Sequence, residues 1–167
     1  MSFQKVLAPF FAVALLVAIL AGMVLPSPQE EQPSLPDDLG QYEHINTLVV
    51  PGSESPIHGI HHFYMNPLGF EIFLNGGTEE YPDGAIIVGK VFKPLETEEG
   101  RFKEGELAAY TLMVKDSDSP ATRETGGWHF VMFGPDRENR GVDPVEGCFG
   151  CHAPSPGTDF ILSTPLR

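Results

Sequence analysis

The chain has 167 residues, of which 23 are acidic and 10 are basic, and its formal net charge is −13. This acidity argues against nucleic acid as a partner, because binding phosphates requires a basic face. It suits a basic redox partner or simple solubility. Beyond residue 25 there is enough chain for one domain with one hydrophobic core.

The first 25 residues are dominated by an apolar run. Val6 to Leu25 carry no charged side chain, and a helix of that length, rising about 1.5 Å per residue, matches the roughly 30 Å hydrocarbon core of a bilayer. We therefore expect residues 1–25 to form an N-terminal transmembrane helix that anchors the chain. The alternative is a removed signal peptide, which usually has a shorter apolar core. Lys5 precedes the run and acidic residues follow it, so the positive-inside bias places the rest of the chain on the periplasmic side of a bacterial cell membrane.

Residues 26–37 are rich in proline and carry acidic side chains, with little to bury. Such a composition predicts a semi-extended linker that holds the domain away from the membrane surface. The folded domain is then expected at residues 38–167.

Short runs of β-branched and aromatic residues, bounded by Gly, Pro, Asp and Asn, follow the linker and predict strands. The turn residues between them favour antiparallel pairing, so the predicted fold is mainly β, with a sheet of about five strands and few short helices. Asn66-Pro67 ends the second strand, and a short helix is expected over residues 68–74. The predicted strands are Ile45 to Val50, Ile57 to Met65, Ala85 to Phe92, Leu107 to Val114 and Trp128 to Phe133.

Cys148-Phe149-Gly150-Cys151-His152 contains both cysteines of the chain in the spacing of a c-type haem attachment motif. The thiols of Cys148 and Cys151 would add to one haem, and His152 would bind its iron through a neutral imidazole nitrogen. A helical turn would place the two cysteines on one face. A disulfide and a zinc site are the alternatives, but the zinc site lacks a second ligand pair. Covalent haem is the favoured interpretation, and it agrees with a periplasmic location.

The second predicted strand is the other stretch rich in possible iron ligands. Strand side chains alternate, so His58 and His62 share one face while His61 lies on the other. A histidine from this strand is an alternative sixth ligand, although a surface or structural role is the default for any single histidine. Two methionines are further possible ligands, although methionine in an apolar strand more often fills the core: Met113 and Met132.

Several pieces of sequence, taken in order and spacing, carry a resemblance to a known family. From about residue 57 to residue 165 the chain resembles the cytochrome P-460 family, which includes the beta-type cytochromes c-prime. The resemblance implies a mainly antiparallel β fold, one c-type haem near the C-terminus and a five-coordinate iron. It also makes a homodimer possible. The matching pieces are Phe63-Tyr64-Met65-Asn66-Pro67, Asp83-Gly84-Ala85-Ile86-Ile87-Val88, Met113-Val114-Lys115-Asp116-Ser117, Gly127-Trp128-His129-Phe130 and Cys148 to His152.

The resemblance also implies where the functional branches of the family differ. Its hydroxylamine-oxidising members carry a haem-linked lysine directly after the strand that matches Asp83 to Val88, and this chain has Gly89 there. Lys90 follows one residue later, and on a regular strand that offset turns its side chain to the opposite face unless a bulge intervenes. Those members also use a carboxylate upstream of the haem cysteines, for which Asp143 and Glu146 are candidates, with a solvated loop position as the default.

The interpretation that fits these features best is a membrane-tethered periplasmic cytochrome with one haem c, whose iron His152 holds. Phe63 and Gly89 are the candidates for an apolar distal side that would bind nitric oxide or a similar small ligand. A protein that only passes electrons, to a redox partner protein or as an accessory haem subunit of a larger membrane complex, is one alternative. Oxidation of hydroxylamine or nitric oxide is the other.

Overall fold

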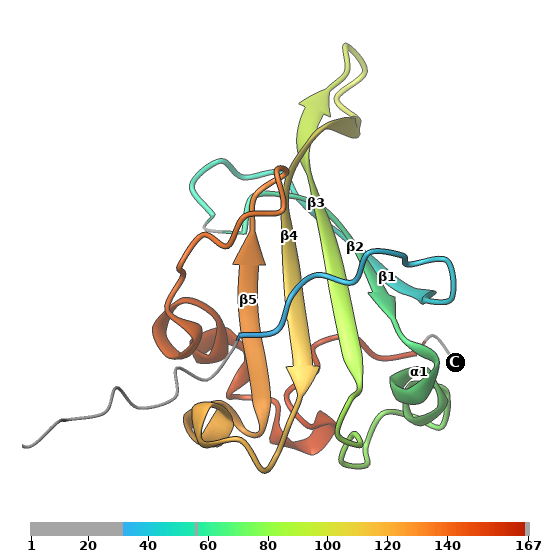
Figure 1. Ribbon diagram of the computed structural model, residues 1–167. Helices are drawn as coiled ribbons and strands as arrows, with labels where there is room; N and C mark the ends of the chain where they lie inside the picture. The colour runs from blue at the N-terminus through green and yellow to red at the C-terminus, as the bar shows by residue number, and fades with distance from the viewer. Residues whose placement is uncertain (1–31, 56, 166–167) are drawn as a thin grey trace, which may run out of the picture.

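The five predicted strands form one antiparallel sheet in the computed structural model of the protein, which describes residues 32–55 and 57–165 (Figure 1). Each strand pairs with the next one in the sequence, so the order across the sheet is β1-β2-β3-β4-β5. The prediction of a mainly β fold with five antiparallel strands and few short helices is confirmed. The strands are β1 (Glu43–Val50), β2 (Gly59–Met65), β3 (Ile86–Glu96), β4 (Phe102–Lys115) and β5 (Trp128–Phe133).

Side chains alternate between the two faces of the sheet, and each face carries its own buried cluster. One face, called the C-terminal face below, is covered by segments from the end of the chain. The other, called the N-terminal face, is crossed by the segment before β1 (Figure 1). The C-terminal face buries Met65, Ile87, Met113, Trp128 and Phe130, together with Ile161. The N-terminal face buries Val88, Leu112, Val131 and Phe133, together with Leu35.

Asn66 ends β2 and starts the helix α1 (Pro67–Leu74). Its side-chain oxygen accepts hydrogen bonds from the backbone N–H groups of Gly69, at 3.1 Å, and Ile86, at 3.0 Å. Its side-chain amide donates a hydrogen bond to the carbonyl of Gly84 at 2.8 Å. An asparagine cap followed by proline at the first helical position is a strong helix start. The predicted end of the second strand and the predicted short helix are therefore confirmed.

The segment before β1 packs on the N-terminal face. Leu35 is 7 % exposed, and the guanidinium of Arg137 donates to the carbonyl oxygens of Leu35 at 3.2 Å and Pro36 at 3.0 Å. Leu35 lies within residues 26–37, the stretch interpreted as a linker. It is the one aliphatic side chain of the proline-rich run, and burying it removes apolar surface from water.

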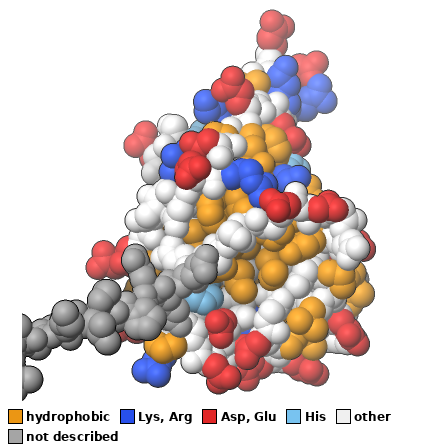
Figure 2. Space-filling view, in the orientation of Figure 1, with side chains coloured by type: hydrophobic (Ala, Val, Ile, Leu, Met, Phe, Trp, Pro, Cys, Tyr) orange, Lys and Arg blue, Asp and Glu red, His pale blue; other side chains and the backbone are white. Residues whose placement is uncertain are grey.

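The β3–β4 hairpin extends beyond the other strands (Figure 1). Charged side chains gather at its tip in the space-filling view, and apolar side chains lie below them over the N-terminal face (Figure 2). An ion pair between Arg101 and Glu99 sits in this exposed tip. The tip therefore adds charge to the surface and no buried residue to either cluster.

The predicted anchor, residues 1–25, and the first part of the predicted linker lie outside the described residues. Among the described residues, no helix combines the length and apolar character needed to cross a membrane.

Candidate functional site

The two cysteines lie in a helical turn near the C-terminus. A π-helical turn, η2 (Val145–Phe149), runs directly into the short helix α2 (Gly150–His152). Asp143 caps this turn, since its carboxylate accepts the backbone N–H of Val145 at 2.9 Å and that of Glu146 at 2.8 Å. The predicted helical turn is therefore present. Asp143, a candidate distal carboxylate, is engaged as its cap.

Both thiols are free, and they differ in exposure. Cys148 is half-buried and Cys151 is exposed. Burial, aided by the negative charge of Asp143, raises the pKa of the Cys148 thiol. No disulfide joins the two cysteines, so both sulfur atoms are available for another bond.

His152 has a fixed hydrogen bond on one ring nitrogen. Its Nδ1 lies 2.7 Å from the carbonyl oxygen of Phe160, and because a carbonyl can only accept, Nδ1 carries the proton and donates. Nε2 then has a free lone pair, the arrangement found in histidines that bind a metal. Burial lowers the pKa of His152, while the bond to Phe160 opposes that shift. The neutral imidazole, the form that binds iron, is therefore favoured.

The ring of His152 packs edge-on against Phe130 of β5, with 4.9 Å between ring centroids. Met132 lies two residues further along β5 and on the same face, because strand side chains alternate. It pairs in register with Thr111 on β4, and Thr111 pairs with Gly89 on β3. Four neighbouring strands thus present a continuous row of residues on the face that His152 contacts through Phe130. This cross-strand row consists of Phe63, Gly89, Thr111 and Met132.

Gly89 lets the row close up. A Cβ atom at this position would lie 2.3 Å from Oγ1 of Thr111, so that side chain would have to move, and 3.0 Å from the ring of Phe63, which is a tight contact. The two proposed distal residues, Phe63 and Gly89, are therefore direct neighbours on the C-terminal face. Thr111 brings the one hydroxyl group of the row, and sequence reasoning did not single it out.

Lys90 lies on the N-terminal face, away from the cross-strand row. The pairing of β2 with β3 is regular through Gly89 and Lys90, and the first irregularity between β3 and β4 follows Val91. The ammonium of Lys90 lies 5.1 Å from the ring centroid of Tyr64 on that face. The one-residue offset thus has the consequence predicted for a regular strand.

The histidines of β2 divide between the two faces. His61 is 5 % exposed, stacks on Phe63 with 5.8 Å between centroids, and contacts the carbonyl of Ile57 through Nε2 at 2.8 Å. His62 points to the other face, where Thr47 and Glu104 bind its two ring nitrogens. His61 is therefore the β2 histidine that shares a face with the cross-strand row. The two candidate methionines also differ, since Met113 is 8 % exposed within the core and Met132 is half-buried.

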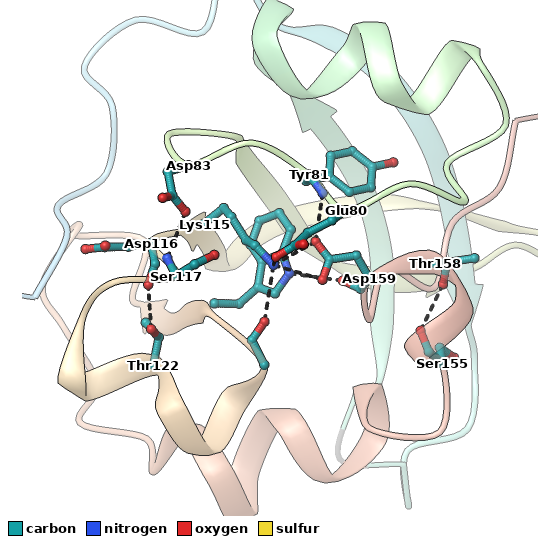
Figure 3. A network of polar contacts seen from close by, with 12 residues as sticks. Glu80, Tyr81, Asp83, Lys115, Asp116, Ser117, Thr122, Ser155, Thr158 and Asp159 are labelled. Carbon is teal, nitrogen blue, oxygen red and sulfur yellow. Dashed lines mark hydrogen bonds and ion pairs between the residues drawn. The ribbon is translucent and has the colours of Figure 1, made fainter.

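A buried ion pair joins Lys115 to Asp159, the residue before Phe160 (Figure 3). Lys115 is 2 % exposed, and its ammonium contacts both carboxylate oxygens of Asp159, at 2.9 and 2.8 Å. Asp159 and Phe160 have φ angles of 48° and 66°, a region that costs of order 1–3 kcal/mol for a residue with a side chain. Sequence reasoning missed this pair. The available signal was alternation, which puts Lys115 on the same face as the core residue Met113.

These residues fit a haem. Two free thiols and a neutral histidine share one short helical segment, and the ring of His152 packs on Phe130 of the C-terminal face of the sheet. Carbon–sulfur bonds from the cysteines and a nitrogen ligand from His152 match the donor set of a c-type haem. The fold and the site together define a β-sheet haem protein.

Comparison with known families gives the particular assignment. A family model described as Cytochrome P460 matches residues 36–163, and the chain belongs to the cytochrome P-460 family. Membership implies a haem cofactor with iron. No curated protein matches the chain.

Proposed function

We propose that the protein is a membrane-tethered periplasmic cytochrome with one covalent haem c that binds nitric oxide or a similar diatomic molecule. Cys148 and Cys151 would hold the haem, and His152 would hold its iron. The observation that carries this proposal is the bond between His152 Nδ1 and the Phe160 carbonyl, which leaves Nε2 free beside the two thiols. Family membership supports the cofactor.

A haem bound here supplies an iron centre able to take a small ligand. His152 presents its Nε2 lone pair, and the carbonyl of Phe160 holds the ring in that tautomer. Phe63 and Gly89 would present an apolar surface to such a ligand, with the hydroxyl group of Thr111 beside them. A surface that is mostly apolar disfavours dioxygen, which needs a hydrogen bond for stable binding, more than nitric oxide.

Gas binding is favoured over hydroxylamine oxidation by the orientation of Lys90. Its side chain lies over Tyr64 on the N-terminal face, so the lysine next to the expected cross-link position faces away from the cross-strand row. Intact mass of the haem protein tests this point. A lysine–haem bond beyond the two thioethers would restore the oxidase alternative.

The tether rests on the apolar run Val6 to Leu25 and on Lys5 before it. Fractionation of cells expressing the full chain should place it in the membrane fraction, with protease added to the periplasm removing the domain. Recovery in the soluble periplasmic fraction with a shortened N-terminus would favour the removed signal peptide.

The haem is tested by expressing the full chain with a cytochrome c maturation system. We expect colour that stays with the polypeptide in acidified acetone, a high-spin resting spectrum, and a change in the Soret band when the reduced protein meets nitric oxide. Cys148→Ser and Cys151→Ser should each lose one thioether bond, while Asp136→Asn, a surface change, should leave the spectra unchanged. Extractable pigment, or none, would contradict the proposal.

Electron transfer with a sixth protein ligand is the second candidate. It is favoured by His61, which is buried and stacked on Phe63 on the same face as the cross-strand row. This alternative predicts a low-spin resting spectrum that becomes high-spin in His61→Phe. Co-purification with other chains after mild detergent extraction would in turn indicate an accessory subunit of a larger membrane complex or a bound redox partner.

A further inference from the structure

We propose that Asp159, held by the buried Lys115, is a positioning residue for His152. Through the backbone of Phe160 it would fix the carbonyl that accepts the His152 Nδ1–H, and so set how strongly the histidine donates to iron. This inference rests on the proposed function, because it concerns the ligand side of the same haem.

The anchor of this arrangement is a fully buried cation. All three donors of the Lys115 ammonium are used, two by the Asp159 carboxylate and one by the carbonyl of Gly126 at 3.2 Å. The ammonium also lies 5.3 Å from the ring centroid of Trp128. Glu80, at 3.7 Å, is three-quarters exposed and adds little. A charge this deeply buried needs its partner, so Asp159 has little freedom to move.

Asp159 is held at two further points (Figure 3). The backbone N–H of Tyr81 donates to one carboxylate oxygen at 2.9 Å, and the indole N–H of Trp128 donates to the Asp159 carbonyl at 3.0 Å. The carboxylate of Asp159 is therefore fixed to the loop before β3, and its backbone carbonyl is fixed to β5. The peptide that leads into Phe160 inherits this fixed orientation.

Phe160 connects Asp159 to His152 through its backbone. Its backbone N–H donates to Ser155 at 2.9 Å and its carbonyl accepts from His152 at 2.7 Å. Its ring packs on Phe149, with 5.0 Å between centroids, and it fills the space beside Gly126, where a Cβ would lie 2.1 Å from it. The ring and the Asp159 clamp thus hold a left-handed backbone that a free loop would not keep.

The consequence concerns the donor strength of the imidazole. A hydrogen bond from Nδ1–H to a fixed carbonyl raises the basicity of Nε2, which stabilises ferric over ferrous iron and lowers the reduction potential. If the Phe160 carbonyl becomes mobile, its hydrogen bond with His152 weakens. Nε2 then donates less strongly to the iron, and the reduction potential rises. Mutation of a partner that hydrogen-bonds to a metal ligand typically changes metal affinity or activity by about 10–100-fold.

The test uses the full-length haem protein in two variants. Asp159→Asn leaves the Lys115 charge unpaired, whereas the double variant Lys115→Met with Asp159→Asn removes both charges and keeps a residue that tolerates the left-handed backbone. Asp136→Asn is the matched control, since it makes the same change in the exposed ion pair with Arg140. Three quantities are measured: the thermal midpoint, the one-electron potential, and the iron–histidine stretching band of the ferrous protein.

We expect both Asp159 variants to raise the potential by the equivalent of a tenfold change in the ferric–ferrous equilibrium, about 59 mV, and to move the stretching band to lower frequency. Only the single variant should lose much thermal stability. A purely structural role predicts that the double variant regains the wild-type potential and band together with stability, and that result would overturn the inference. If Asp159→Asn does not fold, the double variant alone decides.

The haem content separates this inference from the proposed function. If the wild type carries covalent haem and the double variant keeps the wild-type potential, the proposed function stands and the positioning role fails. If the wild type carries no covalent haem, the proposed function fails first, and the positioning role fails with it.

Discussion

Tyr81 is a buried tyrosine whose hydroxyl has no hydrogen-bond partner within the described part of the chain. Its side chain is 2 % exposed, and it packs on Trp128 with 5.9 Å between centroids. Burial, followed by the negative charge of Asp159, raises the pKa of Tyr81 to about 12. An unsatisfied buried hydroxyl costs on the order of 1–3 kcal/mol, so the ring stabilises this position and the oxygen does not.

Tyr81→Phe should therefore keep or increase the free energy of unfolding at pH 7, by up to about 1 kcal/mol. A tyrosine ionises near pH 10 when unfolded and only near 12 in the folded protein, so the wild type loses stability as the pH rises between these values. The variant should lose less over that range. Denaturant titrations at neutral and alkaline pH measure both effects, with Tyr64→Phe as the control. A clear loss of stability at pH 7 would mean that the hydroxyl has a partner.

Gly89 is a second position where a single residue matters, because its lack of a side chain leaves room for Thr111 and Phe63. Gly89→Ala should destabilise the protein by about 1–3 kcal/mol, because the new methyl group meets Oγ1 of Thr111 and the ring of Phe63. In a Thr111→Ala background the same change should cost at least about 1 kcal/mol less, since the nearest atom is gone. Equilibrium unfolding of the wild type, the two single variants and the double variant gives the coupling free energy between residues 89 and 111. Additive effects would show that the two residues do not touch.

At the scale of whole elements, the sheet depends on the segment before β1 to cover its N-terminal face. That segment has no regular hydrogen bonding of its own. It is held by the buried Leu35, by the partly buried Leu39 and Tyr42, and by the contacts of Arg137 with backbone carbonyls. Without it, Val88 and Leu112 would face water, so the segment belongs to the folding unit.

Leu35→Ala should lower the free energy of unfolding by about 2–3 kcal/mol, near the low end for a buried leucine because the site lies at the edge of the core. Leu162→Ala, at a side chain that is 55 % exposed, should change it by no more than about 0.5 kcal/mol. Chemical denaturation compares the two. Equal effects would indicate that residues 32–37 are not part of the folded domain.

At the scale of the whole molecule, the dominant feature is the net charge of −13. A field of this sign attracts cations and repels anions over about one Debye length, which is roughly 30 Å at 0.01 M salt. A basic redox partner would approach faster than an acidic one for that reason.

The salt dependence of reduction tests this consequence. Reduction of the haem protein by a cationic one-electron reductant should slow by about tenfold between low and high ionic strength, and reduction by an anionic reductant should speed up. Stopped-flow absorbance at several salt concentrations gives both slopes. Slopes near zero for both reductants would show that the charge lies away from the haem edge.

Much of the fold follows from local sequence. Short runs of β-branched and aromatic residues between turn residues located all five strands, and Asn66-Pro67 marked the start of α1. The spacing of Cys148, Cys151 and His152 fits covalent haem attachment by itself, because three ligating groups within five residues meet on any helical turn. The face on which Lys90 lies was also predictable from local sequence, because side chains alternate along a regular strand.

The tertiary structure alone decided which distant residues support that motif. Lys115 and Asp159 are 44 residues apart, and no local period links them. The carbonyl that holds His152 belongs to Phe160, whose backbone takes a conformation that its sequence does not favour. Leu35 packs into the core although its flanking prolines are typical of a linker. Short-range patterns report the conformation of neighbouring residues, whereas buried pairings depend on where the chain returns, which only the folded structure fixes.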